Sequence, residues 1–296
     1  MNPRKTQSEP LWQVVPAEVR DQRRLQKLVR SDPHVHRHLG WIPPLEWLGR
    51  HPFLTLQEHG SLRAALACPP DQDGRAWLRL TAVGESLSRA AAWNELWPEA
   101  VDRLQVDGSA SSVQVLVIQR WLEELLVDSG FEQIGTVVVL DWDAAEGGKV
   151  PPGLPLVEIR KVDEEMLDPV HRLDRVCFGF TWGNTRRQIA RALRESALST
   201  AAVVAGEVVG FQISTAGTLG GHLARLAVDP EHRGQGIGKA LVADVLDRFQ
   251  EHGLIRVTVN TQRDNTASLE IYRQFGFVRQ DPTYPVYRFP LEGGGA

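Results

Sequence analysis

The alternation of apolar and polar residues predicts short strands and helices along the whole chain. Residues 223–228 read Leu-Ala-Arg-Leu-Ala-Val, which predicts an apolar strand. An Asp-Pro turn and a loop with glycines at 234, 236 and 238 follow this strand. Apolar residues then recur at three- to four-residue spacing from 237 to 246, which predicts a helix with one apolar face. We therefore expect a strand, a glycine-rich loop and a long helix in direct succession.

The same reading gives the remaining elements of both halves. In the second half it predicts strands at 156–160, 200–204, 208–214, 255–260 and 286–289, and helices at 164–177, 186–195 and 268–275. In the first half it predicts strands at 11–15, 53–57, 64–68, 77–83, 113–118 and 136–140, and helices at 20–31, 90–104 and 119–129. Residues 178–184 are expected to form an aromatic, glycine-punctuated loop.

A stretch rich in glycine and proline separates the two halves. Residues 144–155 show no periodicity, so we expect a linker there, with domains at 1–143 and 156–296. Strands and helices interleave in both halves, which indicates an α/β (mixed α+β) fold class.

The glycines at the start of the predicted helix suggest a phosphate site. Glycines allow a ligand to approach the backbone closely, and the first N–H groups of a helix have no partner within the helix. Together with the helix dipole, these groups attract a diphosphate, and Arg233 adds a positive charge. The dinucleotide fingerprint is excluded because Leu241 stands where its third glycine would be, and a P-loop is excluded because Ala240 follows Lys239.

Two segments resemble the GNAT N-acetyltransferase superfamily. Arg233-Gly-Gln-Gly-Ile-Gly238 is similar to its acetyl-CoA loop, and Asn265…Tyr272…Gly276-Phe277 is similar to a second motif downstream. The resemblance implies a mixed, mostly antiparallel sheet flanked by helices. It also implies an enzyme that transfers acetyl from acetyl-CoA to a primary amine, by direct attack in a ternary complex. The alternative is an acyl-CoA-binding sensor or scaffold protein without turnover.

The resemblance also assigns candidate residues to the cofactor and the acceptor. Those expected to bind acetyl-CoA are Leu226, Ala227, Val228, Arg233, Gly234, Gln235, Gly236, Ile237, Gly238, Lys239 and Asn265. Asn265 either contacts the cofactor or orders the turn before its helix. Phe178, Phe180 and Trp182 either line an acceptor pocket or belong to the core. The acceptor itself, a small molecule or a peptide, is not specified by these residues.

Tyr272 and His222 are the catalytic candidates. Tyr272 stands where many family members carry the tyrosine that protonates the leaving thiolate, although a packed core tyrosine would read the same. His222 occupies the position of the glutamate that serves as base in histone-acetylating members, and its alternative is a surface histidine. Members that acetylate protein N-termini carry a glutamate where this chain has Asn260, which cannot act as a base.

The two halves are related by an offset of 146 residues. Arg79-Leu80 corresponds to Arg225-Leu226 at this offset, and Gly130-Phe131 corresponds to Gly276-Phe277. Across the same offset Ser88, Ala90 and Ala92 replace the three glycines, and Leu126 replaces Tyr272. We therefore expect a tandem protein whose first domain is a degenerate GNAT copy without the acetyl-CoA loop.

Composition limits the other classes of function. The 296 residues are 42% hydrophobic and 24% charged with a net charge of −4, which gives no reason to expect nucleic acid or membrane partners. Two cysteines make no disulfide framework, and we expect a cytoplasmic protein with Cys177 as a small buried residue. His34, His36 and His38 are expected in a solvated loop rather than at a metal. Nothing in the sequence indicates an oligomeric state.

Overall fold

The computed structural model describes residues 12–31, 34–71, 73–146, 157–218 and 220–291. These residues form two compact units. The first holds the described residues up to Ile134 and from Val286 onward, and the second spans Gly135–Pro285. Most of the expected linker lies outside the described residues, and the domain boundaries drawn from the sequence stay a prediction. Within the part of the chain that the structure describes, every helix is too short or too polar to cross a bilayer.

The second unit is built on a mixed sheet. Its strands follow the order β9 (Glu158–Lys161), β10 (Leu198–Val204), β11 (Glu207–Gly217), β12 (Gly220–Val228), β13 (Arg256–Gln262) and β8 (Glu132–Asp143). Neighbouring strands are antiparallel, except that β12 and β13 run parallel. The connection between the parallel pair is α6 (Ile237–Glu251), because parallel neighbours need a crossover.

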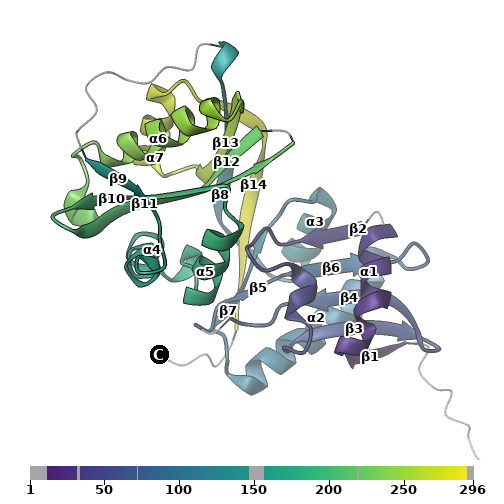
Figure 1. The fold of residues 1–296 in the computed structure, drawn as a ribbon. Helices are drawn as coiled ribbons and strands as arrows, with labels where there is room; N and C mark the ends of the chain where they lie inside the picture. The colour runs from purple at the N-terminus through teal and green to yellow at the C-terminus, as the bar shows by residue number, and fades with distance from the viewer. Residues whose placement is uncertain (1–11, 32–33, 72, 147–156, 219, 292–296) are drawn as a thin grey trace, which may run out of the picture. The chain divides into compact units, whose positions relative to one another are not determined.

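Helices cover both faces of this sheet (Figure 1). α6 and α7 (Thr266–Gln274) lie on one face, and α4 (Leu167–Trp182) and α5 (Arg186–Glu195) lie on the other. The apolar side of α6 packs through Val242, Leu246 and Phe249 against buried residues of β12, β13 and β8. Gly221 allows this approach, since a Cβ at that position would collide with the Phe249 ring.

The expected aromatic loop at 178–184 is wrong. α4 continues to Trp182, interrupted at Gly179, whose φ of 61° and ψ of −161° are not helical. Glycine adopts this conformation without the penalty that a Cβ would bring, so the chain kinks and then resumes its turn. The kink directs residues 180–182 differently from the rest of α4.

The first unit contains an antiparallel sheet in the order β1 (Gln13–Pro16), β3 (Phe53–Glu58), β4 (Ser61–Ala67), β6 (Leu80–Val83) and β2 (His34–Arg37). Leu54 and Leu56 face α2 (Arg89–Asp107) and α3 (Arg120–Asp128), and Phe53 faces α1 (Gln22–Ser31). This alternation along β3 follows from the two-residue period of a strand. The mixed α/β class is confirmed.

Two sequence expectations for the first unit are wrong. The predicted strand at 77–83 is split into β5 (Ala76–Trp77) and β6. It breaks because the N–H of Leu78 donates to Gln114 in β7 (Ser112–Leu116), whereas the N–H of Arg79 donates to Ala67 in β4. Residues 34–37, expected in a loop, form strand β2 beside β6. Within the described residues, no group of three His, Cys, Asp or Glu side chains is arranged to hold a metal ion.

The 146-residue offset reappears in the elements themselves. β4 begins at Ser61 and β11 at Glu207, and α3 begins at Arg120 and α7 at Thr266. The last strands, β8 and β14 (Val278–Pro290), begin at Glu132 and Val278. Each pair keeps the spacing found between the sequence motifs, which supports a duplicated domain.

The last strand of each half pairs with the other half's sheet. β13 pairs with residues 137–143 of β8, within the second unit. β7, the counterpart of β13, pairs instead with residues 286–290 of β14, within the first unit. The two homologous halves have therefore exchanged their final strands.

Buried His36 gives the first unit a pH-dependent stability. Burial lowers its pKa from 6.5 to about 4, partly offset by the Leu78 backbone. Between these pH values the unfolded chain binds more protons than the folded one. The contribution of His36 to the free energy of unfolding is therefore fully present above pH 6.5 and is lost as the pH falls toward 4. We expect a loss of about 3 kcal/mol across this window.

Denaturant unfolding followed by tryptophan fluorescence checks this, because most tryptophans lie before residue 135. The variant His36→Gln should show a shallower loss between pH 6.5 and pH 4 than the natural chain. An equally steep loss in the variant would remove His36 as the cause.

Candidate active site

The start of α6 has the features of a diphosphate site. Gly236 is its N-cap with a φ of 81°, no side chain caps the helix, and the first turn holds no acidic residue. Within the described part of the chain, the backbone N–H groups of residues 234–239 have no hydrogen-bond acceptor. Gly234 has a φ of 77°, and a Cβ added there would point into open space. Unpaired N–H donors at the start of a helix are the groups that favour binding of a phosphate or diphosphate.

Arg233 and Cys177 meet at one backbone carbonyl beside this cradle. Arg233 Nε donates to the Val228 carbonyl over 3.2 Å, and Cys177 Sγ donates to the same oxygen over 3.3 Å. Burial raises the pKa of the Cys177 thiol, which disfavours the nucleophilic thiolate. Arg233 remains exposed and can face an anion. Cys177 is only partly buried, so the expectation of a buried cysteine there is wrong.

A cleft opens where β12 and β13 separate. The two strands pair only from Gly221 with Val257 to Leu223 with Val259. Beyond that point β12 stays with β11, and β13 stays with β8. A register shift leaves Ala224 as an extra residue on β12. The pocket in this cleft is lined by Val137, Phe178, Trp182, Leu223, Ala224, Arg225, Leu226, Val259, Asn260, Thr261, Gln262, Asn265, Ser268 and Tyr272.

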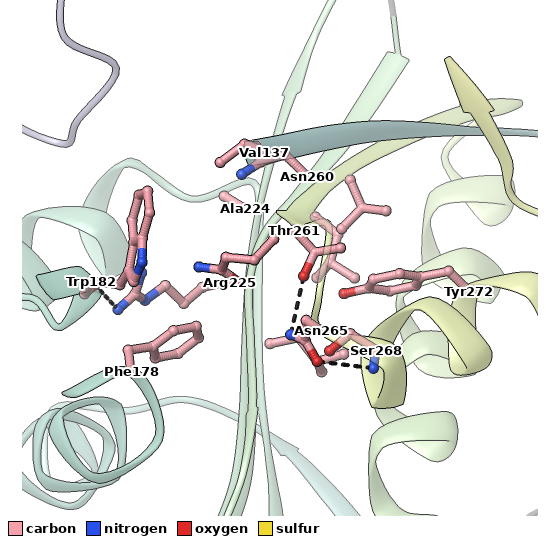
Figure 2. Close-up of a pocket in the computed structure, with 14 residues that line it drawn as sticks. Val137, Phe178, Trp182, Ala224, Arg225, Asn260, Thr261, Asn265, Ser268 and Tyr272 are labelled. Carbon is pink, nitrogen blue, oxygen red and sulfur yellow. Dashed lines mark hydrogen bonds between the residues drawn. The ribbon is translucent and has the colours of Figure 1, made fainter. Parts of the chain in front are cut away.

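Tyr272 projects from α7 into this pocket. Figure 2 shows its hydroxyl pointing toward the centre, from the side opposite Phe178 and Trp182. Among the described residues, none hydrogen-bonds to this hydroxyl, while the ring packs 5.4 Å from that of Phe277. Burial raises the pKa of Tyr272 above its ordinary value. The phenol is therefore held protonated, with its donor available to a ligand in the pocket.

Asn265 shapes the turn that positions Tyr272. Its side-chain oxygen accepts from the Ser268 N–H over 3.2 Å and so caps α7, and its amide donates to Thr261 Oγ1 over 3.1 Å (Figure 2). These bonds join β13 to α7 at the pocket's edge. The sequence leaves two roles open for Asn265, contact with the cofactor and ordering of the turn. In the structure both hydrogen bonds of its side chain serve to order the turn.

His222 lies next to the pocket but does not line it. Its Nδ1 is 2.8 Å from Thr258 Oγ1. Burial lowers its pKa, and this effect is partly offset by hydrogen bonding with Asn260 and Thr258. Asn260, with which His222 is hydrogen-bonded, does line the pocket.

The expected aromatic residues divide into two groups. Phe178 and Trp182 line the pocket, while Phe180 is half exposed and does not. The Arg225 guanidinium lies 3.6 Å from the Phe178 ring centroid and pairs with Asp174 of α4. The sequence reading did not assign a role to Arg225 or Asp174. The recurrence of arginine at 79 and 225 was the one available signal.

The corresponding region of the first unit is closed by its own chain. Ser88, the counterpart of Gly234, caps α2 by accepting from the Ala91 N–H over 3.1 Å. β2 lies along β6, whose residues 80–83 are the counterpart of 226–229 at the 146-residue offset. Leu126 replaces Tyr272 and is buried in the core. A side-chain cap and an extra strand thus occupy the places that are open in the second unit.

Comparison with known proteins agrees with this geometry. Residues 167–277 match the model of the acetyltransferase (GNAT) family. N-alpha-acetyltransferase 30 of Schizosaccharomyces pombe is 37% identical over 79 residues, which is 27% of this chain and 51% of that protein. A mycothiol acetyltransferase of Arthrobacter sp. is 32% identical over 121 residues, covering 37% of each chain. The chain therefore spans about half, or less, of these relatives.

Solved structures share the complete fold. A tandem GNAT protein from the clavulanic acid biosynthesis pathway superimposes with a TM-score of 0.64 at 17% identity, covering 96% of this chain and 99% of that one. A GCN5-related N-acetyltransferase from Sphaerobacter thermophilus gives a TM-score of 0.64 at 15% identity, covering 96% of both. Residues 167–277 thus form a domain of the GNAT acetyltransferase family, in a chain with the tandem GNAT fold.

Proposed function

We propose that the second unit transfers an acetyl group from acetyl-CoA to a primary amine by direct attack in a ternary complex. The observation that carries this proposal is the combination of unpaired N–H groups at the start of α6 and a cleft containing the Tyr272 hydroxyl. The relatives support an amine acceptor, because two of them are named N-alpha-acetyltransferase 30.

Backbone groups perform most of the binding in this proposal. The N–H groups of residues 234–239 and the Arg233 guanidinium hold the diphosphate. Beyond Leu223 the edge of β12 no longer pairs with β13, so its backbone can pair with an extended pantetheine arm as it would with a strand. A backbone N–H near Val228 would polarise the thioester carbonyl. The reacting groups are thereby brought together in one cleft.

Tyr272 supplies a hydrogen bond to the departing sulfur. An alkyl thiol has a pKa of about 8.5 and a free tyrosine about 10, so complete proton transfer to the thiolate is uphill. Burial raises the pKa of Tyr272 further, which keeps the phenol protonated. We therefore assign it the stabilisation of the leaving thiolate as a hydrogen-bond donor.

His222 is the proposed base, although it does not line the pocket itself. An amine with a pKa of about 10.4 is overwhelmingly protonated at neutral pH and must lose a proton before it attacks. Burial lowers the pKa of His222, so its imidazole is neutral and can accept a proton. Because His222 is not among the residues that line the pocket, the proton would travel through an intermediary such as water.

We assign the first unit no acetyl-CoA site of its own. The Ser88 cap satisfies a donor at the start of α2, and β2 takes the edge of β6 that corresponds to the proposed pantetheine strand. The first half of the sequence would then serve to supply β8, whose residues 137–143 pair with β13 within the second unit.

Two measurements test the function. Calorimetry with coenzyme A should show one binding site per chain, and acetyl-CoA should release free thiol when a peptide N-terminus, an aliphatic amine or an aminosugar is added. Binding without thiol release across such a panel would favour the acyl-CoA-sensing alternative. Absence of binding would defeat both.

A further inference from the structure

We propose that Arg225 and Asp174 are positioning residues that hold one wall of the acceptor pocket and thereby set its affinity for the amine. The wall is residues 178–184, named the acceptor wall below. This inference rests on the proposed acetyl transfer, and it adds a pair of residues to which neither the sequence motifs nor the relatives' names assign a role.

The pair itself is buried and bidentate. Arg225 Nε donates to Asp174 Oδ1 over 2.5 Å, and Nη2 donates to Oδ2 over 2.9 Å. The Asp174 side chain is fully buried and that of Arg225 is 12% exposed. Arginine matches a carboxylate with two parallel bonds in a fixed plane, so the pair defines an orientation as well as a contact.

Both members of the pair are tied to the acceptor wall. Arg225 Nη2 also donates to the Trp182 carbonyl over 2.6 Å, as Figure 2 shows. Asp174 Oδ2 accepts from the Asn184 N–H over 2.6 Å. At the wall's other end, the Phe178 ring packs against the guanidinium at 3.6 Å. The pair therefore contacts the wall at its beginning and at its end.

The acceptor wall needs such ties because α4 is interrupted within it. The non-helical backbone at Gly179 interrupts the regular geometry of the helix, so residues after it are not positioned by the first part of α4 alone. Arg225 comes directly after Ala224, the extra residue of β12, and lines the pocket from the strand. Arg225, a residue of β12, thus holds the acceptor wall on the opposite side of the same pocket.

Charge pairing decides what Arg225 does. Its positive charge is matched by a buried carboxylate at hydrogen-bond distance, so it is not available as the partner of an anionic acceptor. Its contribution is the location of Phe178 and Trp182, which line the pocket. A displacement of about 1 Å at a reacting centre can cost about 100-fold in rate.

Three variants separate this role from general stability. Arg225→Lys keeps the charge but loses the two-pronged geometry. Asp174→Asn keeps the size but weakens both bonds, and it leaves a buried guanidinium less compensated. The double variant Arg225→Met with Asp174→Leu removes both charges together, which avoids leaving an unpaired buried ion. The matched control is Asp168→Asn, which breaks another Arg–Asp pair of α4, the exposed bond from Arg186 Nε over 2.6 Å.

Steady-state kinetics and calorimetry supply the readouts. We expect each of the three variants to raise the acceptor KM or lower kcat/KM for the amine by about tenfold or more, with the Kd for coenzyme A changed by less than about twofold. Hydrogen exchange of residues 178–184 should accelerate in the same variants. Asp168→Asn should leave all three measurements unchanged.

Two failures are distinguishable. If the natural chain binds coenzyme A but releases no thiol with any amine, the proposed function fails and the acceptor role falls with it. If the natural chain turns over while the folded double variant keeps the same amine kcat/KM and the same exchange at 178–184, the positioning role is overturned and the proposed function stands.

Discussion

Replacing Gly236 by valine is expected to lower the affinity for coenzyme A by about 100-fold or more, which corresponds to roughly 3 kcal/mol. Gly236 has a φ of 81° as the N-cap of α6. A β-branched residue disfavours this conformation and turns the loop away from it, at a cost of about 1–2 kcal/mol. Each donor lost to a charged phosphate removes about 1.5–3 kcal/mol more. Isothermal calorimetry measures the change directly.

The matched control for this variant is Gly206→Val. Gly206 has a φ of 86° in the turn between β10 and β11, and a Cβ there has no neighbour within 4 Å. The backbone penalty is therefore similar, while the start of α6 is untouched. Equal losses of affinity in both variants would attribute the effect to stability. Retained binding in a folded Gly236→Val chain would contradict the diphosphate site.

Replacing Tyr272 by phenylalanine is expected to lower kcat by about 10- to 100-fold, with the acetyl-CoA KM nearly unchanged. Phenylalanine keeps the ring contact with Phe277 and removes only the hydroxyl, which has no partner among the described residues. The loss therefore falls on the step in which the thiolate departs. Stopped-time assays of free thiol at saturating substrates measure it.

The pH dependence gives the Tyr272 prediction a second test. Because burial raises the pKa of Tyr272, the phenol stays protonated as the pH rises, and it should produce no descending limb of kcat below about pH 10. Tyr287→Phe is the control, since it removes the Tyr287 hydroxyl bond to Glu123 within the first unit. An unchanged kcat in Tyr272→Phe would exclude this residue as the hydrogen-bond donor.

Local chemistry made much of the site predictable. Glycines at 234 and 236 are typical of positions with positive φ, and both residues have positive φ at the start of α6. α5 spans 186–195 as its periodicity indicated, because its apolar face and its Thr185 cap are encoded within a few residues. Tyr272 is singled out by the resemblance of the second motif to the GNAT superfamily, and it lines the pocket.

The remaining features depend on distant partners. Arg225 and Asp174 are 51 residues apart, and no local pattern shows that the one neutralises the other. His34 and His36 lie in β2 because β6 offers a free edge, which a search for metal-type spacing does not detect. β7 pairs with β14. Because β8 and β14 are homologous strands, the local sequence does not indicate which of the two β7 will pair with.

This strand pairing means that neither half of the sequence forms a complete sheet by itself. A protease cut between residues 144 and 155 would break one covalent bond. β8 would still be hydrogen-bonded to β13 of the downstream fragment, and β14 to β7 of the upstream fragment. We expect such a nicked chain to elute intact from a sizing column and to separate only in denaturant. Fragments that part without denaturant would contradict the strand pairing.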